Sequence, residues 1–405
     1  MQRIERIQGH MRPAAQVEVV VVAATRTPIA KAKRGAFKDT TPDVLLRQVF
    51  EGILNQTKID PKIIGDIVVG NVLQPGSAAV GARMGQLCAG IPYSVPLNSV
   101  NRQCSSGLQA FANVASAIQA GYYDVGIAAG VESMSLTDMG SSAPDVNWED
   151  VYANEGATNC TVSMGLTSEN VAAKYGITRA QQDAMAAESH AKAATAQAKG
   201  YFAAEITPVV LKTDDGETVV ISQDEGVRPG TTVEGLAKLR ASFKENGTTT
   251  AGNSSQVSDG AAACLVMTRA MAEKLQLPIL GSFVSYAVAG VPPEIMGIAN
   301  DGEGPAYAIP EALAKAGLAI DDIDVFEINE AFASQALYCI DTLKIPKHKV
   351  NPNGGAIALG HPLGCTGARQ IATLLHELQR TQKTYGVISM CIGTGMGAAA
   401  VFKRA

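Results

Sequence analysis

The sequence alternates between strand and helix patterns, and this alternation restricts the possible folds more than any other feature. Apolar runs rich in β-branched residues predict buried strands at residues 17–24, 63–70 and 124–131. Residues 42–54 carry apolar side chains at helical spacing, with Thr41 in position to cap the first turn, and a further helix is expected over residues 105–120. Strands that alternate with helices predict an α/β protein with largely parallel sheets.

The C-terminal third repeats this plan at a nearly constant offset. DIVVGN at residue 66 matches DVFEIN at residue 324, CSSGLQ at residue 104 matches GCTGAR at residue 364, and YDVGIAAG at residue 123 matches YGVISMCI at residue 385. The matched pairs lie 258, 260 and 262 residues apart and keep the same order of elements. Such self-similarity predicts two duplicated halves.

The positions of the repeats divide the chain. We expect an N-terminal half over residues 17–131, completed by a returning segment at about 262–283, and a C-terminal half over residues 284–405. The segment between them, residues 132–261, contains the only Trp and an Ala-rich helix at about 179–199, and is predicted to be an inserted loop subdomain.

Composition limits the possible partners. The chain has 33 Lys and Arg against 38 Asp and Glu, so it lacks the basic footprint that nucleic acid or an anionic membrane surface requires. The longest strongly apolar stretch, residues 17–24, is far too short to span a bilayer. We therefore expect a globular protein without a nucleic-acid partner or stable membrane association.

Seven cysteines without a C-x-x-C pair indicate free thiols in a reducing, intracellular compartment. His361 and Cys365 are four residues apart, but no second ligand pair accompanies them, so no metal site is expected.

One of the seven thiols, that of Cys104, is a candidate nucleophile. Cys104, in NRQCSSG, directly precedes a predicted helix, whose free N–H groups and dipole favour a thiolate. The alternative is a small buried side chain.

Three further motifs carry candidate groups. His361 lies in a glycine-rich loop, NGGAIALGHPLGCTGAR, as a candidate base for a thiol elsewhere in the fold, or as a structural histidine. Cys391 ends a predicted strand in SMCIGTGMG, which has too little chain after it for a dinucleotide site. Asn329, in NEAF, lies at a strand-to-helix junction as a candidate functional residue, and the alternative is that it only caps the helix.

Together these four motifs resemble the signatures of the thiolase family, and the resemblance runs from about residue 17 to the end of the chain. The duplicated halves and the insertion are also similar to the thiolase fold, a layered α-β-α-β-α architecture. Within the family, segments such as GAFKDTTPD and TTTAGNSSQVSDGAAA are most similar to the peroxisomal 3-ketoacyl-CoA thiolases.

The resemblance implies a role for each motif residue. It implies that Cys104 is the acylated nucleophile, that His361 activates it, and that Cys391 is the acid and base at the α-carbon of the acetyl unit. It implies two oxyanion sites. His361 and Asn329 form one, with Asn329 acting through a water that it holds, and the N–H groups of Cys104 and Gly393 form the other. For coenzyme A it implicates a set of residues in or beside the insertion: Arg228, Ser255, Ala251, Phe243, Met164 and Phe332.

The implied reaction is the coenzyme A-dependent cleavage of 3-ketoacyl-CoA to acetyl-CoA and an acyl-CoA two carbons shorter, the last step of fatty-acid β-oxidation. Coenzyme A is then a substrate, with no permanently bound cofactor, and the family implies a homodimer. One alternative is an acetoacetyl-CoA thiolase with a narrow chain-length range. Another is a non-catalytic acyl-CoA carrier, against which all four filled catalytic positions argue.

The first 16 residues resemble a targeting leader. Arg3-Ile4, five residues and then His10-Met11 are similar to the N-terminal peroxisomal signal, which an import receptor reads. The alternatives are a solvated basic leader or a transit peptide for another organelle. Glu5 and the absence of Ser argue against transit, so we expect the peroxisome.

Overall fold

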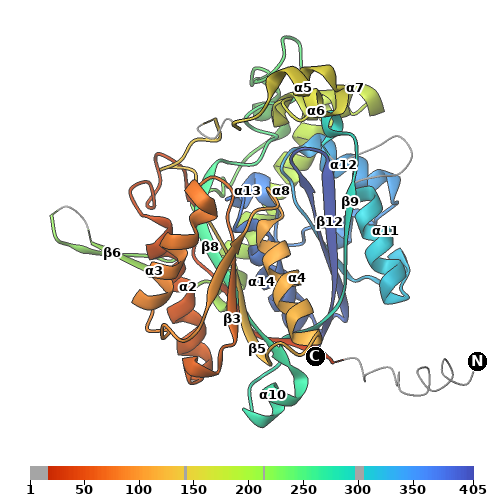
Figure 1. Cartoon of the computed structure of the whole chain (residues 1–405). Coiled ribbons are helices and arrows are strands. Elements are labelled where there is room, and N and C mark those ends of the chain that lie inside the picture. Colours follow the sequence, from red (N-terminus) through yellow and green to blue (C-terminus); the bar gives the residue numbers. More distant parts are fainter. Residues whose placement is uncertain (1–16, 141–143, 213–214, 297–304) are drawn as a thin grey trace, which may run out of the picture.

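The computed structural model describes residues 17–140, 144–212, 215–296 and 305–405, and shows two strand-and-helix halves side by side (Figure 1). The targeting leader at residues 1–16 lies outside the described residues.

The strands run in the order β10-β11-β12-β9-β1-β8-β5-β3-β4, and β2 (Ala30–Lys31) also pairs with β8. The N-terminal half contributes β1 (Val19–Arg26), β3 (Asp66–Gly70), β4 (Leu97–Val100), β5 (Val125–Ser133) and β8 (Ser258–Thr268). The C-terminal half contributes β9 (Gly281–Gly290), β10 (Val325–Ile328), β11 (Tyr385–Ile392) and β12 (Met396–Arg404). Among the described strands, those of the two halves pair with each other where Val20 and Val21 of β1 lie opposite Ser282 and Gly281 of β9.

The repeat seen in the sequence is the repeat of the fold. β3 pairs with β5 in parallel, as β10 does with β11, and each second strand then pairs antiparallel with β8 or β12. The predicted strands and helices occur, and the expected α/β class with two duplicated halves is confirmed. The expectation of largely parallel sheets is wrong, because β1, β9 and β12 pair antiparallel with their neighbours and the sheet is mixed. The helix predicted at residues 42–54 is α2 (Pro42–Thr57), although the Thr41 side chain makes no capping hydrogen bond.

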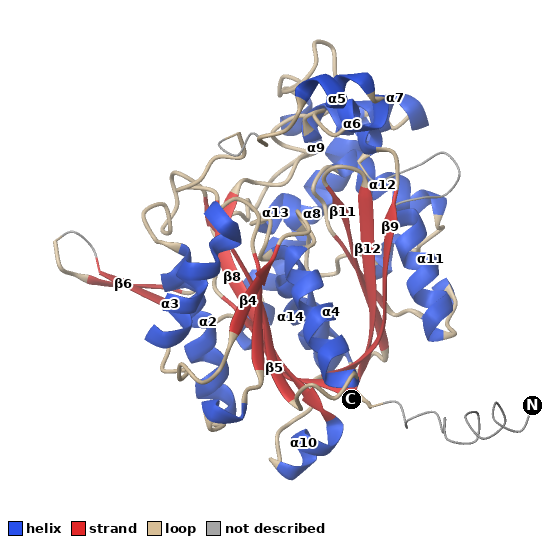
Figure 2. Cartoon of the chain, viewed as in Figure 1, coloured by secondary structure: helices blue, strands red, loops and turns tan. Residues whose placement is uncertain are grey.

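Helices form the remaining layers, as Figure 2 shows by colour. α4 (Ser106–Gln119) and α14 (Thr366–Thr381) lie between the two strand layers, because apolar side chains cover each helix and pack on strands of both halves. α2 and α3 (Ala79–Cys88) cover the outer face of the N-terminal half. α11 (Pro305–Ala316) and α12 (Ala333–Thr342) cover the outer face of the other half. The result is five layers.

The two central helices approach closely at equivalent glycines. A Cβ on Gly367 would lie 2.2 Å from the Leu108 nitrogen, and one on Gly107 would lie 2.7 Å from the Gly364 oxygen. Only glycine allows this approach. Phe111 of α4 also packs edge-on against Phe402 of β12, with ring centroids 5.2 Å apart, so that α4 contacts the opposite half.

The first helices of the insertion lie at one end of the layers, above the strand ends (Figure 1). The predicted Ala-rich helix is α8 (Arg179–Ala198), whose start is fixed by a capping box between Thr178 and Gln181. The other elements are α5 (Trp148–Ala153), α6 (Glu155–Asn159), α7 (Met164–Tyr175), β6 (Val209–Lys212), β7 (Thr218–Ile221) and α9 (Val233–Ala237). α10 (Arg269–Lys274) follows β8, and α13 (Ala356–Leu359) precedes α14. The residue boundaries of the halves stay a prediction.

Within the residues that the structure describes, no helix combines the length and apolar character needed to cross a membrane.

Candidate active site

Three of the candidate residues lie where parallel strands end. Asn329 follows β10 directly, Cys391 is the second-last residue of β11, and Cys104 lies between β4 and α4. Carboxyl ends of parallel strands meet at one edge of a sheet, where open α/β proteins place their ligands. His361 reaches the site from the loop between α13 and α14.

A tight turn presents Cys104. The Asn101 side chain accepts a hydrogen bond from the Gln103 N–H (2.9 Å), and the Ser106 hydroxyl accepts one from the Arg102 N–H (2.9 Å). Gln103 has φ +47°, a left-handed conformation that costs a non-glycine residue free energy and that is typical of functional sites. The turn leaves Cys104 9% exposed at the start of α4.

Cys104 lies beside the second thiol and its loop. The Gly393 N–H donates a hydrogen bond to the Cys104 thiol. Burial, and then the neighbouring Cys104, raise the pKa of the Cys391 thiol well above its ordinary value. Burial likewise raises the pKa of Cys104 to about 11, although the Gly393 N–H acts in the opposite direction. The helix start alone favours a thiolate, but burial outweighs it. Cys104 therefore needs a base.

His361 is held in one tautomer. Its Nδ1 lies 2.6 Å from the Thr366 Oγ1, and the Thr366 hydroxyl donates to the Pro362 carbonyl (3.1 Å). With that hydroxyl proton directed to the carbonyl, and with the amide nitrogen of Asn329 as a donor near Nε2, we assign the ring proton to Nδ1 and the lone pair to Nε2. Nε2 lies 3.4 Å from the Asn329 Nδ2. Burial, and then the Arg369 guanidinium, lower the pKa of His361 to about 3, so the ring is neutral at pH 7.

Glu132 positions the loop that carries His361, and sequence reasoning missed it. Its buried carboxylate accepts hydrogen bonds from the N–H groups of Gly364 (2.9 Å), Val72 (3.1 Å) and Leu73 (3.1 Å). It thereby joins the loop after β3 to the loop before α14. Burial raises the pKa of Glu132 to about 7. The available signal was one acid inside the apolar run VGIAAGVES.

Most residues that the resemblance implicates for coenzyme A come together. The Phe243 and Phe332 rings meet edge-on with centroids 6.0 Å apart, and Phe243 packs on Gly165, next to Met164. The Ser255 N–H donates to the Ala331 carbonyl (3.0 Å), and Ala251, which is exposed, lies earlier in the same loop.

Arg228 lies further out. Its N–H donates to the His190 Nδ1 (3.2 Å). Gln256 connects the segment that carries Arg228 to the catalytic loop. Its side chain donates to the Gly226 carbonyl (2.8 Å), and its backbone carbonyl accepts from the His361 N–H (3.1 Å). In the described part of the chain, no group of three or more His, Cys, Asp or Glu side chains is arranged to hold a metal ion.

Comparison with known proteins identifies the family of the chain. The family model described as "Thiolase, N-terminal domain" matches residues 19–270, and "Thiolase, C-terminal domain" matches residues 277–404. The chain belongs to the thiolase family. It is 61% identical to the peroxisomal 3-ketoacyl-CoA thiolase B of Rattus norvegicus, over 96% of this chain and 92% of that protein. It is 56% identical to the peroxisomal 3-ketoacyl-CoA thiolase of Homo sapiens, over 100% and 99% of the two chains.

Solved thiolase structures share the fold. The dimeric peroxisomal thiolase of Saccharomyces cerevisiae superposes with a TM-score of 0.90 at 49% identity, over 96% of this chain and 98% of that one. Another structure of the yeast enzyme, with a TM-score of 0.79 at 44% identity, covers 98% of this chain and 100% of that one. It is described as five α-β-α-β-α layers built from two core domains of identical topology, as found here.

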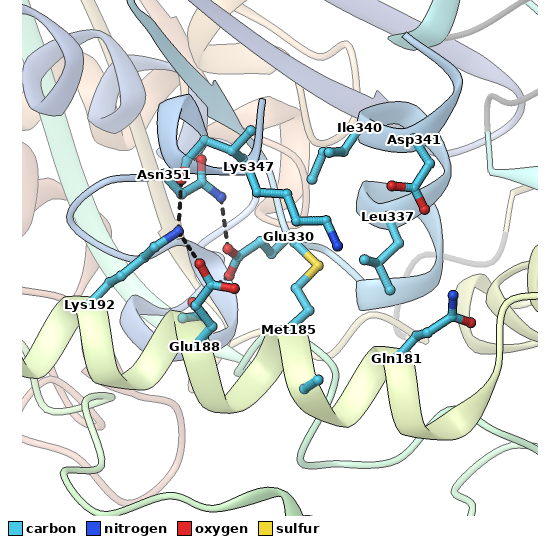
Figure 3. Close-up of a pocket in the computed structure, with 13 residues that line it drawn as sticks. Gln181, Met185, Glu188, Lys192, Glu330, Leu337, Ile340, Asp341, Lys347 and Asn351 are labelled. Atoms are coloured by element: carbon cyan, nitrogen blue, oxygen red, sulfur yellow. Dashed lines mark hydrogen bonds and ion pairs between the residues drawn. The ribbon is translucent and has the colours of Figure 1, made fainter. Parts of the chain in front are cut away.

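A cavity of about 160 Å³ lies between α8, α12 and the segment that leads to α13 (Figure 3). Glu330, the neighbour of Asn329, reaches it. Its buried carboxylate accepts hydrogen bonds from Ser189 Oγ (2.6 Å), Asn351 Nδ2 (2.7 Å) and the Ile357 N–H (3.1 Å). Because Ile357 lies in the turn before His361, Glu330 fixes the position of both Asn329 and His361. Glu330 belongs to the NEAF motif, in which only Asn329 and Phe332 were assigned roles from the sequence.

Proposed function

We propose that this thiolase is a 3-ketoacyl-CoA thiolase, which cleaves 3-ketoacyl-CoA with coenzyme A to acetyl-CoA and a shortened acyl-CoA. The observation that carries the proposal is the meeting of Cys104, Cys391 and the Gly393 N–H at the strand ends, with the paired Asn329 and His361 entering from the second half. Curated relatives at 56–61% identity bear the same name.

In the first half-reaction, the Cys104 thiol gives its proton to the His361 Nε2, and the sulfur attacks C3 of the substrate. The C2–C3 bond breaks, and its electron pair leaves as the enolate of acetyl-CoA, which takes a proton from the Cys391 thiol. Cys104 now carries the acyl group as a thioester, with His361 protonated and Cys391 a thiolate. Splitting the reaction at a covalent intermediate divides one difficult step into two.

In the second half-reaction, the Cys391 thiolate takes the proton of the coenzyme A thiol. The resulting thiolate attacks the acyl-Cys104 carbonyl, shortened acyl-CoA leaves, and the Cys104 sulfur recovers its proton from His361. The enzyme is thus restored without net gain or loss of protons. A general acid and base near the reacting carbon typically contributes 10²–10⁴-fold.

Two oxyanion sites complete the proposal. The N–H groups of Cys104 and Gly393 face the acyl oxygen on Cys104, and Asn329 with His361 faces the thioester oxygen of the acetyl unit, in the case of Asn329 through a water. A well-placed donor of this kind is worth about 3–4 kcal/mol in the transition state. Met164, Phe243, Phe332, Ala251 and Ser255 form the proposed path of the pantetheine arm, and Arg228 its outer end.

The rate of thiolysis over a series of acyl chain lengths tests the proposal. A 3-ketoacyl-CoA thiolase cleaves medium and long 3-ketoacyl-CoA substrates. An acetoacetyl-CoA thiolase, which the relatives do not favour, cleaves only the C4 substrate. Acylation of Cys104 by substrate, detected as a stoichiometric burst, separates either enzyme from a non-catalytic carrier.

A homodimer fits one apolar surface. Val80, Met84 and Leu87 lie at helical spacing on α3 and are 70%, 57% and 44% exposed, beside the edge strand β4. A row of exposed apolar side chains next to an open strand edge suits a second copy of the chain. Met84→Glu should give monomers by light scattering at micromolar concentration, where the unchanged protein is a dimer.

We also propose a peroxisomal enzyme delivered by an import receptor that reads residues 1–16. The rat and human relatives, and those of Petunia hybrida and Arabidopsis thaliana, are named peroxisomal.

A further inference from the structure

A recess with an excess of positive charge lies at the surface beside Arg228. Lys31, Arg34 and Arg228 line it, together with Glu225 and the backbone of Gly35 and Ala36. Arg34 and Arg228 are exposed and Lys31 is half-buried. Among the described residues, none of these three cations forms an ion pair or a side-chain hydrogen bond, so each is free to bind an anion.

Glu225, the one acid of the recess, is occupied by the backbone. Its carboxylate accepts hydrogen bonds from the N–H groups of Ala36 (2.9 Å) and Lys31 (3.1 Å). It lies so close to the chain that a Cβ on Gly35 would be 2.1 Å from its Oε2. Glu225 therefore shapes the loop of residues 31–36 instead of neutralising the cations.

The fields of two of these cations converge on one side chain. Burial, and then Arg228 and Lys31, lower the pKa of His190 to about 4. Lys31 and Arg228, which are far apart in the sequence, are thus close enough to act on the same imidazole. The recess is a site of positive potential contributed by two segments of the chain.

A short extended segment links the recess to the catalytic loop. The Ala32 N–H, next to Lys31, donates to the Val257 carbonyl (3.0 Å). The preceding Gln256 carbonyl accepts from the His361 N–H (3.1 Å), and the Gln256 side chain donates to the Gly226 carbonyl (2.8 Å) near Arg228. The recess therefore lies at the outer end of a segment whose inner end borders His361.

We propose that Lys31 and Arg34, together with Arg228, bind the phosphate groups at the nucleotide end of coenzyme A. The proposal rests on the proposed function, which places the thiol end of the coenzyme at Cys104 and leaves the 3′-phosphate and pyrophosphate at the far end of the pantetheine arm. Guanidinium groups bind phosphate through paired hydrogen bonds and an ammonium group acts as a point charge, so two arginines and a lysine suit a phosphate dianion.

The double variant Lys31→Ala/Arg34→Ala tests the proposal, with activity and calorimetric binding measured for coenzyme A and for 3′-dephospho-coenzyme A. We expect KM and Kd for coenzyme A to rise about tenfold or more while kcat is unchanged, since the two side chains are remote from Cys104. The preference of the wild type for coenzyme A over its dephospho form should shrink in the variant. If Lys31 and Arg34 contact only the pyrophosphate, the variant should bind coenzyme A and 3′-dephospho-coenzyme A more weakly by the same factor. That result also supports the site.

The matched control is Lys33→Ala/Lys38→Ala, which removes two charges from the same loop. Lys33 pairs with Asp138 and Lys38 with Asp39, and both side chains are exposed. If this control weakens coenzyme A binding as much as the test variant, the effect is one of net charge and the proposal is wrong. It is also wrong if the test variant binds coenzyme A within twofold of the wild type. A wild type that binds coenzyme A but cleaves no 3-ketoacyl-CoA contradicts the proposed function alone.

Discussion

The Nδ1 atom of His361 lies 2.6 Å from the hydroxyl oxygen of Thr366, five residues further along the chain. Since the Thr366 hydroxyl donates to the Pro362 carbonyl, it can only accept from the imidazole. The loop that carries the base and the first residue of α14 are therefore coupled, and the free lone pair of Nε2 is directed into the site.

Thr366→Val should lower kcat about tenfold or more and leave KM for coenzyme A unchanged. Valine keeps the volume but offers Nδ1–H no acceptor, so the tautomer with its proton on Nε2 is no longer disfavoured. Steady-state kinetics measure the effect, and the urea midpoint shows whether the fold is intact. Thr366→Ser retains the hydroxyl and should keep most of the activity. A Thr366→Val enzyme with a normal kcat would show that the hydroxyl does not set the tautomer.

Cys104→Ser should nearly abolish thiolysis without loss of the fold or of coenzyme A binding. The buried thiol already has a pKa of about 11, and a serine hydroxyl is far less acidic, so a neutral His361 does not activate it. Loss of one essential nucleophile typically costs several decades in rate. Retention of more than about a tenth of the wild-type kcat contradicts the assignment.

Cys391→Ala should lower turnover strongly and still permit acylation of Cys104 by a reactive acyl thioester. The reason is that the proposed role of Cys391 is to protonate the departing carbon, a step that such a thioester does not require. Mass spectrometry of the intact protein measures the acyl-enzyme. If no stoichiometric adduct forms, the two cysteines do not divide their roles in this way.

The buried His361 should make stability depend on pH. Its pKa is about 3 in the folded protein and about 6.5 in the unfolded chain, so below pH 6.5 only the unfolded chain binds the proton. The free energy of unfolding therefore falls as the pH drops from about 6.5 toward 3, by up to about 1.4 kcal/mol per unit for this one group.

His361→Asn removes that contribution. The difference in unfolding free energy between wild type and His361→Asn, from urea titrations, should decrease by about 2 kcal/mol between pH 7 and pH 5. Other titrating groups, such as the buried His190, are common to both proteins and cancel. A difference that stays constant over this range means that His361 is charged in the folded protein at pH 5.

The sequence predicts the elements of this fold well because the information is local and repeated. The matched motifs set the order of β3, α4 and β5 against β10, α14 and β11, and glycine pairs such as Gly107 and Gly367 recur at the same offset. Cys104, His361, Asn329 and Cys391 could be singled out because each lies in a motif next to an element boundary.

What the sequence could not supply depends on contacts between distant segments. In the sequence, Glu132 is only an acid within an apolar strand, and its hydrogen bond from the Gly364 N–H depends on the fold. The hydrogen bonds of Glu330 likewise come from Ser189 and Ile357, which belong to other elements. The pKa of the Cys104 thiol shows the same limit of prediction from sequence. Its helix start is visible in the sequence and favours the thiolate, whereas the burial that outweighs it is a property of the folded chain.

The last prediction concerns delivery to the peroxisome. Residues 1–16 fused to a fluorescent reporter should direct it to peroxisomes, because Arg3-Ile4, five residues and His10-Met11 follow the basic–apolar–x5–His–apolar pattern. At helical spacing, Ile4, Ile7 and Met11 would share one face for the receptor. Met11 stands where Leu or Ala is usual, so Met11→Leu should import at least as well. Arg3→Ala/His10→Ala should stay diffuse, while Gln2→Ala/Gln8→Ala, which leaves the pattern intact, serves as the matched control. Diffuse signal from the unchanged leader in cells with working peroxisomal import, or signal in mitochondria as expected for a transit peptide, contradicts the assignment.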